Sequence, residues 1–441
     1  MQPDPRLDER PEGAAMSTVL VIGAGYVGLT TSACLAHLGH DVTCVDIDEE
    51  KVSKLRQGHI PIHESGLPEL VKTGISNERL RFEVGSTNAA RGSEFVFFCL
   101  PTPQAADGKV DIDAILSVVN EIREVLAPGS VIVNKSTVPV GTNAIIAAAT
   151  RRDDLFVVSN PEFLSEGSAV NDFLQPDRII IGSDDLTAGR RVASLYASID
   201  TPVIQVDPPS AETIKYATNS FLATKVSFVN ALAAVCEAVG ADIDAVTAGL
   251  GSDSRISAQF FLPGPGWGGS CFPKDMEALI RIAADAGYEF DLLRAVISAN
   301  EQQFERIVTK AGSLLGGELG GASVALLGLT FKAHTDDLRN SPAIEVAQRL
   351  TLNGAAVRAY DPMITSAVGI PKEIQISTTI EEALTGADLA IILTEWPEFA
   401  LANWSKLANL MNAPRLVDAR NLLERDAMFE LGFRYDDLGR T

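Results

Sequence analysis

Residues 18–46 read TVLVIGAGYVGLTTSACLAHLGHDVTCVD, and this stretch decides the fold. It begins with an apolar, β-branched run, Thr18–Ile22, turns at a G-x-G-x-x-G pattern from Gly23 to Gly28, and continues with helical spacing. A second strand-like run, Asp41–Val45, then ends at Asp46. This order of strand, glycine turn, helix and strand predicts a parallel βαβ unit. The N-terminus of its helix is expected to lie beside a bound ligand.

The glycine pattern predicts a dinucleotide site. Gly23 permits the tight turn, Gly25 lets the backbone approach a pyrophosphate, and Gly28 allows close packing of helix on strand. The start of the helix supplies amide donors to the phosphates. A carboxylate at the end of the second strand would bind the ribose, favouring NAD and repelling the extra phosphate of NADP. Flavin is the competing ligand, but nothing later in the chain requires one. The contacts expected here are Gly23, Gly25, Tyr26, Val27, Gly28 and Asp46.

Strand-like runs alternate with helical stretches through the rest of the first half, which predicts a doubly wound sheet. These runs are 94–100, 130–134, 155–159 and 178–181. One long helix is then expected from a Ser210 cap to Val239. A second lobe should follow the glycine-rich linker 316–322, with strands at 323–327, 389–393 and 416–417 and another ending at Tyr360-Asp361. The expected domains are a disordered extension 1–15, an NAD-binding domain 16–209, a central helical domain 210–315, and a second Rossmann-like domain 316–441.

Composition limits the possible classes of function. The 441 residues include 36 basic and 58 acidic side chains, a net charge of −22. A nucleic-acid or anionic-membrane partner is therefore disfavoured, because counterion release needs a basic face. No apolar run is expected to reach the roughly 20 residues of a membrane helix, and residues 1–15 are too polar for a secretory signal. Five cysteines without a C-x-x-C pair are typical of a reduced cytoplasmic protein, and no metal site is expected.

A second informative segment, 263–275, reads PGPGWGGSCFPKD. Its dense glycine lets the backbone approach a ligand closely. It presents Cys271 shortly before Lys274 and Asp275, and a neighbouring cation favours the thiolate, which is the nucleophilic form. This setting predicts that Cys271 is a nucleophile. The other cysteines lie in apolar runs and are expected to be buried core residues: Cys34, Cys44, Cys99 and Cys236.

From Met16 onward, several further motifs occur in a characteristic order. They are VIGAGYVGL, CLPTP (99–103), KSTVPVGT (135–142), NPEFLSEGSA (160–169), ETIKYATNSFLATKVSFVN, GWGGSCFPKD, GLTFKAHTDDLRNSPA (328–343), YDP and TEW (394–396). Through them the chain resembles the UDP-glucose/GDP-mannose dehydrogenase family, and most closely its UDP-glucose 6-dehydrogenase members.

The resemblance implies a four-electron oxidation of UDP-glucose to UDP-glucuronate with two NAD per sugar. Cys271 would attack the aldehyde, and the thiohemiacetal would be oxidised to a thioester that water hydrolyses. A thiol is needed because a hemithioacetal can surrender hydride to NAD whereas a free aldehyde cannot. Lys215 and Asn219, spaced i,i+4 on the long helix, would stabilise the oxyanion. Thr137 with Lys215 would hold the water, and Asp275 would orient or activate it.

Other roles also follow from the resemblance. Glu162 is a candidate acid–base or water-orienting group, and Glu166 borders nicotinamide and substrate; the two would share one face if a helical turn formed there. Arg255 would reach the substrate across a dimer interface. Leu262 replaces a basic residue of many relatives, so one phosphate or sugar contact is expected to be absent or supplied elsewhere.

The remaining contacts implied by the resemblance fall into two sets. Further cofactor contacts are Lys51, Thr102, Thr137, Glu166, Lys274 and Arg339. Substrate contacts are Glu162, Phe163, Leu164, Ser165, Glu166, Lys215, Asn219, Arg255, Phe260, Phe261, Leu262, Pro263, Gly264, Gly268, Phe331 and Lys332.

The resemblance thus implies two Rossmann-like doubly wound α/β domains joined by a long central helix. It implies that the central domain 210–315 carries the loop of the catalytic cysteine and mediates dimerisation, and that the domain 316–441 binds the UDP-sugar. It implies a cytoplasmic homodimer or higher homo-oligomer that makes UDP-glucuronate for nucleotide-sugar and polysaccharide biosynthesis. GDP-mannose and UDP-N-acetylhexosamine 6-dehydrogenases are alternatives, which tend to carry Ser-Cys-Leu-Pro and His-Cys-Ile-Pro where this chain has Ser270-Cys-Phe-Pro273. From other classes, a 3-hydroxyacid dehydrogenase would not need Cys271, and a non-catalytic nucleotide-binding scaffold would need none of these catalytic residues.

Overall fold

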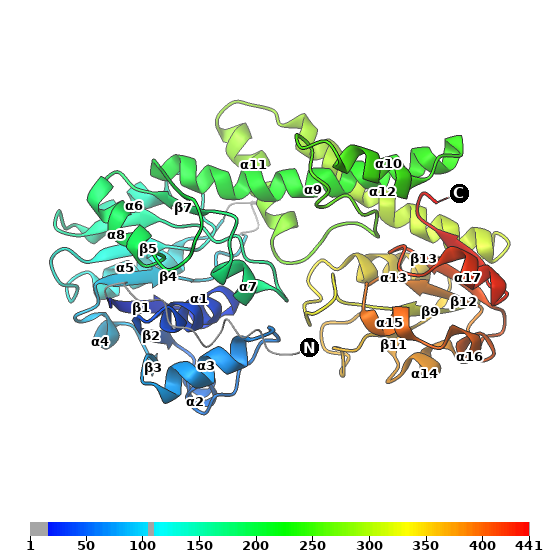
Figure 1. Ribbon diagram of the computed structural model, residues 1–441, viewed down its shortest axis with the longest axis horizontal. Coiled ribbons are helices and arrows are strands. Elements are labelled where there is room, and N and C mark those ends of the chain that lie inside the picture. Colours follow the sequence, from blue (N-terminus) through cyan, green and yellow to red (C-terminus); the bar gives the residue numbers. More distant parts are fainter. Residues whose placement is uncertain (1–15, 105–109, 441) are drawn as a thin grey trace. The chain divides into compact units, whose positions relative to one another are not determined.

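The computed structural model describes residues 16–104 and 110–440. The predicted extension 1–15 lies outside these residues. The chain divides into two compact units, Met1–Ala217 and Thr218–Thr441. Each unit contains a sheet with helices packed on both faces (Figure 1). The division into four segments with boundaries at 15, 209 and 315 stays a prediction.

The first unit alternates strands and helices. Its described strands are β1 (Thr18–Ile22), β2 (Asp41–Asp46), β3 (Leu80–Val84), β4 (Phe95–Phe98), β5 (Val131–Asn134), β6 (Phe156–Ser159), β7 (Ile179–Gly182) and β8 (Val203–Val206). Its described helices are α1 (Tyr26–His37), α2 (Glu49–Arg56), α3 (Leu67–Ser76), α4 (Thr87–Ala90), α5 (Asp113–Ile122), α6 (Thr142–Thr150), α7 (Ala169–Leu174) and α8 (Leu186–Ser194).

The strands of the first unit are ordered β3-β2-β1-β4-β5-β6-β7-β8 among the described residues. The first six strands have the order of the Rossmann fold, in which ligands bind where the strand order reverses, beside β1. All pairs are parallel except β6 and β7, which meet at Ser159 and Gly182. The predicted doubly wound sheet is therefore confirmed, with one antiparallel pair added near its edge.

β1 explains why this sheet carries near-continuous apolar runs. Val19 and Val21 pack into one hydrophobic cluster with α1, α2, α3, α7 and α8. Leu20 and Ile22 pack on the opposite face with α4, α5 and α6. Because alternate side chains point to opposite faces and both faces are covered, every position of the strand favours an apolar residue.

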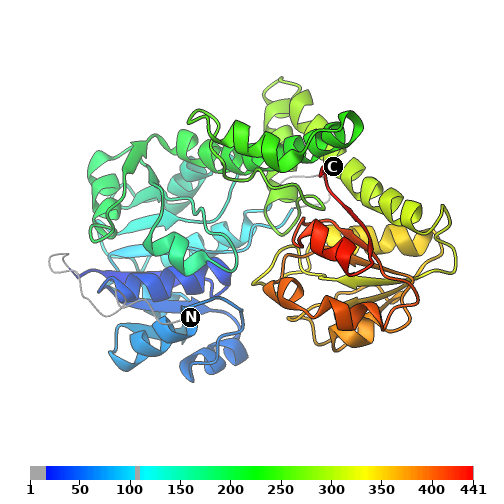
Figure 2. The same cartoon turned by 45° about the vertical axis from the view of Figure 1, so that its right-hand side comes forward.

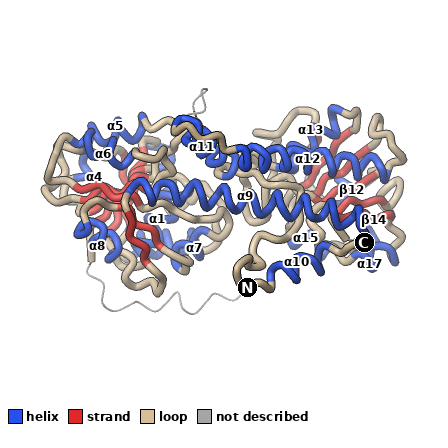
Figure 3. Tube along the Cα trace, turned by 90° about the horizontal axis from the view of Figure 1, so that it is seen from above, coloured by secondary structure: helices blue, strands red, loops and turns tan. Residues whose placement is uncertain are grey.

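A single long helix, α9 (Pro208–Val239), contains the boundary between the two units, and Figure 3 shows it uninterrupted. The prediction that Ser210 caps it is wrong. The carboxylate of Asp207 accepts hydrogen bonds from the backbone N–H and the hydroxyl of Ser210, so Asp207 is the cap. α9 is also long and apolar enough to cross a membrane, which corrects the expectation of no such run; core helices of soluble proteins meet the same criterion.

The second unit begins with helices and ends with a sheet. Its described helices after α9 are α10 (Ile243–Gly251), α11 (Phe272–Asp285), α12 (Asp291–Leu314), α13 (Pro342–Leu352), α14 (Ile380–Leu384), α15 (Pro397–Leu401), α16 (Trp404–Ala408) and α17 (Arg425–Glu430). Its described strands are β9 (Ser323–Leu327), β10 (Ala356–Tyr360), β11 (Ile374–Ile376), β12 (Leu389–Ile392), β13 (Arg415–Asp418) and β14 (Arg434–Asp437).

The sheet of the second unit repeats the plan of the first. Its order, β11-β10-β9-β12-β13-β14, is again the Rossmann order, and its described pairs are all parallel. Val324 and Leu326 pack with α12 and α13, whereas Ala325 and Leu327 pack with α14 to α17 on the other face. Figure 2 shows this yellow-to-red sheet between its helices. Two Rossmann-like domains and a long helix were predicted, and they are confirmed.

Candidate active site

The glycine turn after β1 is shaped by three different constraints. Gly23 has φ +102°, and a Cβ there would lie 2.4 Å from the carbonyl oxygen of Cys99. A Cβ on Gly28 would lie 1.7 Å from the carbonyl oxygen of Gly23, so this position also requires glycine. A Cβ on Gly25 would meet nothing within 4 Å. The space beside Gly25, at the start of α1, is therefore open to a phosphate group.

Asp46 lies at the end of β2, facing this turn. Its carboxylate accepts hydrogen bonds from the backbone N–H of Ala24 at 3.0 Å and from Lys51 Nζ at 2.8 Å. Burial raises the pKa of Asp46, but the bonds from Lys51 and from the N–H groups of Asp48 and Ala24 outweigh it and hold the pKa below its usual value. The group is therefore an anion at neutral pH, as a ribose-binding carboxylate must be.

A buried ion pair lies at the other predicted centre of the first unit. Lys215 Nζ on α9 contacts Glu162 Oε1 at 2.9 Å, and both side chains are less than a tenth exposed. Burial alone would raise the pKa of Glu162, but the charge and hydrogen bond of Lys215, the N–H of Leu164 and the charge of Lys135 lower it below its usual value. The pair is therefore charged and held in one geometry.

The loop after β6 places Glu162 without any helix. Asn160 anchors it, since its Nδ2 donates to the carbonyl of Ile180 and its Oδ1 accepts from Tyr196 at 2.6 Å. Residues 161–165 have no regular structure and α7 begins at Ala169. Because no helical turn joins Glu162 to Glu166, the expectation that they share a helical face is wrong.

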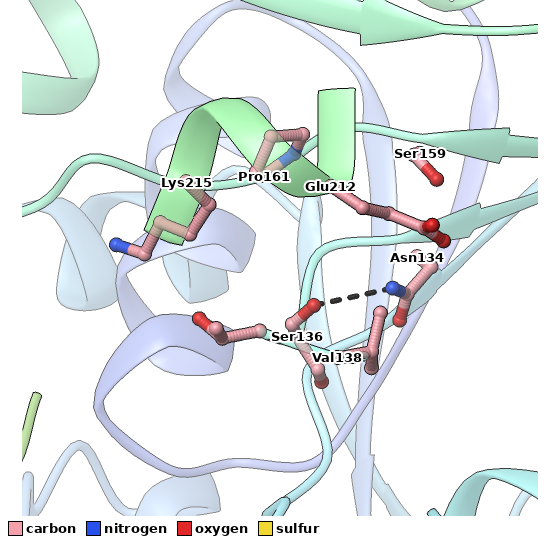
Figure 4. Close-up of a pocket in the computed structure, with 8 residues that line it drawn as sticks. Asn134, Ser136, Val138, Ser159, Pro161, Glu212 and Lys215 are labelled. Carbon is pink, nitrogen blue, oxygen red and sulfur yellow. Dashed lines mark hydrogen bonds between the residues drawn. The ribbon is translucent and has the colours of Figure 1, made fainter. Parts of the chain in front are cut away.

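Thr137 and Lys215 line one small pocket in the first unit, together with Glu212, Ser136 and Ser159 (Figure 4). The carbonyl of Thr137 accepts a hydrogen bond from Thr102 at 2.8 Å. The Glu212 carboxylate, on α9, accepts hydrogen bonds from the N–H groups of Gly141 and Asn143. These bonds join the start of α6 to α9. The structure thus brings together the predicted water-holding residues Thr137 and Lys215.

The segment that contains Glu166 is held by hydrogen bonds from residues far away in the sequence. Glu64 is buried, and its carboxylate accepts from the N–H groups of Gly167 and Ala169. The hydroxyl of Tyr26 contacts Glu64 and accepts from Gly167 N–H. Tyr26, predicted as a cofactor contact, therefore also ties the glycine turn to the loop of Glu166.

The predicted nucleophile, in the second unit, lies at the start of a helix. Cys271 is exposed and forms the N-cap of α11, where the N–H groups of the first turn favour a negative charge on the sulfur. One turn later, Asp275 is buried, and its carboxylate accepts from Asn219 Nδ2 at 2.6 Å and from Lys274 Nζ at 2.7 Å. Four predicted residues, Cys271, Lys274, Asp275 and Asn219, thus gather in this unit.

The glycines before Cys271 are needed for packing against the C-terminal sheet domain. A Cβ on Gly268 would lie 1.9 Å from the carbonyl oxygen of Asn340. Gly269 has φ +81°, and its Cβ would lie 3.0 Å from the ring of Phe331. Phe331, predicted to bind substrate, therefore lies directly against the loop of residues 263–275, called here the cysteine loop. Lys332 Nζ lies 5.5 Å from the centre of the Phe331 ring.

Other predicted contacts occupy varied settings. Arg255 and Arg339 are exposed and pair with Asp253 and Asp337, each at a sequence distance of two. Phe163 lies between two cations, Arg178 and Lys215, at 4.0 and 5.4 Å from its ring centre. The substrate and cofactor roles of these residues stay predictions.

The segment before the glycines divides between core and surface. The ring of Phe261 packs into a hydrophobic cluster of α9 and α10, with Lys225 Nζ 4.4 Å from its centre. Phe260 and Leu262 are exposed, whereas Pro263 and Gly264 are buried. Leu164 is half-buried beside Glu162, and Ser165 is exposed. A contact of Phe261 with a ligand would therefore have to use its backbone.

The second sheet has an aspartate where the first has Asp46. Asp361 follows β10, but its carboxylate is buried and accepts from the backbone N–H groups of Leu329 and Thr330, the Thr330 hydroxyl and the Trp396 indole. The same oxygen, Oδ2, serves all four, and Oδ1 accepts from Met363 N–H. This carboxylate is bound to its own fold, and its burial keeps it out of reach of a ribose.

Four of the five cysteines are buried, as predicted. Burial raises the pKa of the Cys44 and Cys99 thiols to about 12, and that of Cys34 also rises. A thiol that stays protonated is a poor nucleophile, so these residues act as small apolar groups.

Comparison with known proteins agrees with this geometry. The NAD-binding, central and UDP-binding domains of the UDP-glucose/GDP-mannose dehydrogenase family match residues 17–200, 209–302 and 325–425. A UDP-glucose 6-dehydrogenase of Bacillus subtilis is 42% identical, over 96% of this chain and 97% of that protein. One of Pseudomonas aeruginosa is 42% identical, over 95% and 97%.

Solved structures point the same way. A UDP-glucose dehydrogenase of Pyrobaculum islandicum superposes with a TM-score of 0.88 at 33% identity, covering 98% of this chain and 99% of that one. A UDP-D-ManNAc dehydrogenase of Pyrococcus horikoshii gives a TM-score of 0.85 at 26% identity, covering 96% and 99%. The chain belongs to the UDP-glucose/GDP-mannose dehydrogenase family.

In this member of the UDP-glucose/GDP-mannose dehydrogenase family, NAD is the cofactor, and the first unit fits it. The open space at Gly25 suits a pyrophosphate, and the anionic Asp46 suits a ribose diol.

Replacement of Asp46 should relax the choice of cofactor. The unmodified protein is expected to prefer NAD strongly over NADP, because the Asp46 carboxylate repels a 2′-phosphate. Asp46→Ala should lower kcat/KM with NAD and reduce the difference in kcat/KM between NAD and NADP, because Lys51 would then face the 2′-phosphate of NADP. Steady-state kinetics with both cofactors measure this, with the exposed Glu49→Ala as a control from the same segment. Equal efficiency with NADP before mutation would contradict the assignment.

Sequence reasoning missed two residues that hold this family member's site loops. Glu64 and Glu212 are buried carboxylates that accept backbone N–H groups of segments about 70 to 100 residues away in the chain, where α7 and α6 begin. A glutamate before a helix or within one carries no local signal for such a contact. Only the folded arrangement reveals it.

Proposed function

We propose that this protein is a UDP-glucose 6-dehydrogenase that converts UDP-glucose, two NAD⁺ and water to UDP-glucuronate and two NADH through a thioester on Cys271. The observation that carries the proposal is the exposed Cys271 at the start of α11, beside the buried Asn219–Asp275–Lys274 cluster. The relatives named UDP-glucose 6-dehydrogenase match along nearly the whole chain, which supports the substrate.

The chain's own groups can perform the covalent steps. The first oxidation yields an aldehyde, and the Cys271 sulfur adds to its carbonyl carbon to give a thiohemiacetal, whose oxygen takes up a proton. Bound NAD⁺ supplies the acceptor for the hydride lost in each oxidation. The thiohemiacetal becomes a thioester, and water then displaces the sulfur. Asn219 and Lys215 would stabilise the oxyanions of these steps.

Glu162 and Lys215 suit the proton transfers. A buried carboxylate whose ion pair keeps it charged can accept a hydrogen bond from a water and orient it. Thr137 lines the same pocket as Lys215 and can hold that water. Asp275 would take the proton of the attacking water in the second unit, with its partners Asn219 and Lys274 fixing its orientation.

The sequence of the cysteine loop favours UDP-glucose over the alternatives. Ser270-Cys-Phe-Pro-Lys-Asp275 differs from the loops of the N-acetylhexosamine and GDP-mannose enzymes. A fold-level match to the UDP-D-ManNAc dehydrogenase of P. horikoshii keeps N-acetylhexosamines as the second candidate.

Two NADH should form per UDP-glucose consumed. Purified protein would be mixed with limiting UDP-glucose and excess NAD⁺, and NADH absorbance would be compared with the sugar product by mass spectrometry. GDP-mannose and UDP-N-acetylglucosamine run in parallel identify the substrate. One NADH per sugar would indicate a simple alcohol dehydrogenase, and none would indicate a nucleotide-binding scaffold.

We further propose that the protein forms a homodimer or higher homo-oligomer through α9. Phe221, Phe228 and Val235 are exposed on this helix at intervals of seven residues, so they form one apolar stripe. A second copy would cover this stripe and remove the surface that makes α9 resemble a membrane helix. The mass of the protein in solution tests this. We place the protein in the cytoplasm, where its cysteines stay reduced.

A further inference from the structure

The cysteine loop is held by hydrogen bonds to buried polar side chains on two helices, α9 and α12. On α9, the Asn230 side-chain oxygen accepts from Gly264 N–H at 2.8 Å, and Ser227 accepts from the Trp267 indole at 2.9 Å. On α12, Gln303 donates to the carbonyl of Gly264 at 2.7 Å. All of these side chains are buried, so each bond replaces one that water would otherwise supply.

Asn300 makes the most specific of these contacts. Its Oδ1 accepts from Trp267 N–H at 2.9 Å, and its Nδ2 donates to the carbonyl of the same residue at 3.0 Å. Asn300 is only 5% exposed. A side-chain amide is the natural group that can both accept and donate in this way with no charge. Gly266 makes room for it, since a Cβ there would lie 2.7 Å from Asn300 Oδ1.

Trp267 is therefore a fixed point just before the reactive cysteine. Its indole packs into a core cluster with Ala223, Met276 and Leu293, and its backbone is held by Asn300. Only three residues separate it from Cys271. The next two, Gly268 and Gly269, are pressed against Asn340 and Phe331, and Asn340 Nδ2 donates to the carbonyl of Gly269 at 3.2 Å.

We propose that Asn300 is a positioning residue, which fixes the backbone at Trp267 and thereby sets where the Cys271 sulfur stands. The role rests on the proposed function, because it matters only if Cys271 attacks the substrate. It acts through the loop and touches neither substrate nor cofactor. A displacement of about 1 Å in a reacting group can cost on the order of 100-fold in rate.

The aspartate variant separates positioning from packing. Asn300→Asp keeps the shape and the acceptor for Trp267 N–H, but it places a carboxylate oxygen against the Trp267 carbonyl. A protonated carboxyl can again accept with one oxygen and donate with the other. Because burial raises a carboxyl pKa, we expect the introduced carboxyl group to become protonated within the pH range of the assay, which restores the hydrogen bond to the Trp267 carbonyl.

Two cations contact residues that hold or form the loop, Arg306 at the Asn230 carbonyl and Arg420 beside Gly264, and they would oppose the rise of this pKa in part. Arg349, at the ring of Phe304, is already paired with Glu301, Glu305 and Glu345.

The test measures kcat, KM and melting temperature for Asn300→Ala and Asn300→Asp from about pH 6 to about pH 8.5. Asn300→Ala should lose roughly 10- to 100-fold in kcat with KM for NAD nearly unchanged. The ratio of Asn300→Asp to unmodified kcat should rise as pH falls. Gln302→Ala, an exposed neighbour on α12 whose amide reaches only Ser298, should behave as the unmodified protein.

A flat ratio across pH, or a kcat within about twofold of the unmodified value in both variants, would overturn the proposal. If neither variant folds, Ser227→Ala decides, because it removes the acceptor of the Trp267 indole together with one bond to the Val296 carbonyl on α12. It should lower kcat several-fold at constant KM, and an unchanged kcat would overturn the positioning role of these contacts. The proposed function is judged separately, by the two NADH per sugar formed by the unmodified protein.

Discussion

Cys271→Ala is expected to abolish UDP-glucuronate formation while the protein still binds NAD and UDP-glucose. Neither binding contact depends on the sulfur, but the second oxidation needs a thiohemiacetal. Calorimetry would measure binding, and mass spectrometry would measure the product. Cys236→Ala is the matched control, since Cys236 is a buried thiol in the hydrophobic core of α9 and α10. Near-normal UDP-glucuronate from Cys271→Ala, with two NADH per sugar, would mean that a hydrated aldehyde is oxidised instead.

Cys271→Ser should trap the intermediate. Its hydroxyl is a poorer nucleophile than a thiolate but can attack the aldehyde slowly to give a hemiacetal. The hemiacetal then loses hydride to NAD⁺ and becomes an ester, which hydrolyses more slowly than a thioester. Incubation with UDP-glucose and NAD⁺ should therefore add the mass of the oxidised nucleotide sugar to the peptide that contains position 271. The absence of any adduct from a variant that consumes the sugar would argue against covalent catalysis.

Lys215→Met should cost both activity and stability. Glu162 would be left as a buried carboxylate without its ion-pair partner, a change that typically costs about 3–5 kcal/mol in the free energy of unfolding. Lys135, whose charge also lowers the pKa of Glu162, would offset part of this cost. Oxidation and thioester hydrolysis should both slow, because the same cation serves successive oxyanions. Denaturant unfolding and single-turnover kinetics measure the two effects.

The sign of the pH dependence distinguishes the ion pair from simple packing. In the unmodified protein the pKa of Glu162 is lowered, so its contribution to stability is present above the unfolded pKa and is lost as pH falls through the folded pKa. In Lys215→Met burial dominates and the pKa should rise, so the deficit relative to the unmodified protein should shrink as pH falls. Lys215→Met/Glu162→Gln should recover stability without activity. A deficit independent of pH would refute this explanation.

Much of the fold could be predicted because local pattern and tertiary demand agree. Thr18–Ile22 and Ser323–Leu327 are strands at the predicted bounds, since a strand covered on both faces must be a continuous apolar run. The glycine turn could be predicted because its steric needs permit only glycine at Gly23 and Gly28. The polar, glycine-rich surroundings of Cys271 distinguished it from the four cysteines that are buried, and the structure shows it exposed.

What failed depended on choices that local pattern does not decide. Ser210 and Asp207 are both good caps, and the helix starts at the earlier one because Pro208 suits its first turn. Glu162 and Glu166 have helical spacing, but Asn160 is bound to the neighbouring strand and to Tyr196, and residues 161–165 after it form no regular structure. The contacts of Glu212 and Asn300 join segments distant in the chain, which no local window contains.

The commitment of Asp361 to five internal hydrogen bonds bears on the timing of the reaction. The second sheet has the Rossmann strand order, but the aspartate at the position of a ribose-binding acid is bonded to its own fold. The second lobe therefore offers no second dinucleotide site of that kind. Two oxidations of one sugar then require the cofactor to be exchanged between them. During that exchange the half-oxidised sugar could escape, and the proposed bond to Cys271 would hold it on the protein. A weakened bond should therefore appear first as leakage of UDP-sugar aldehyde into solution, before any loss in the rate of the first oxidation.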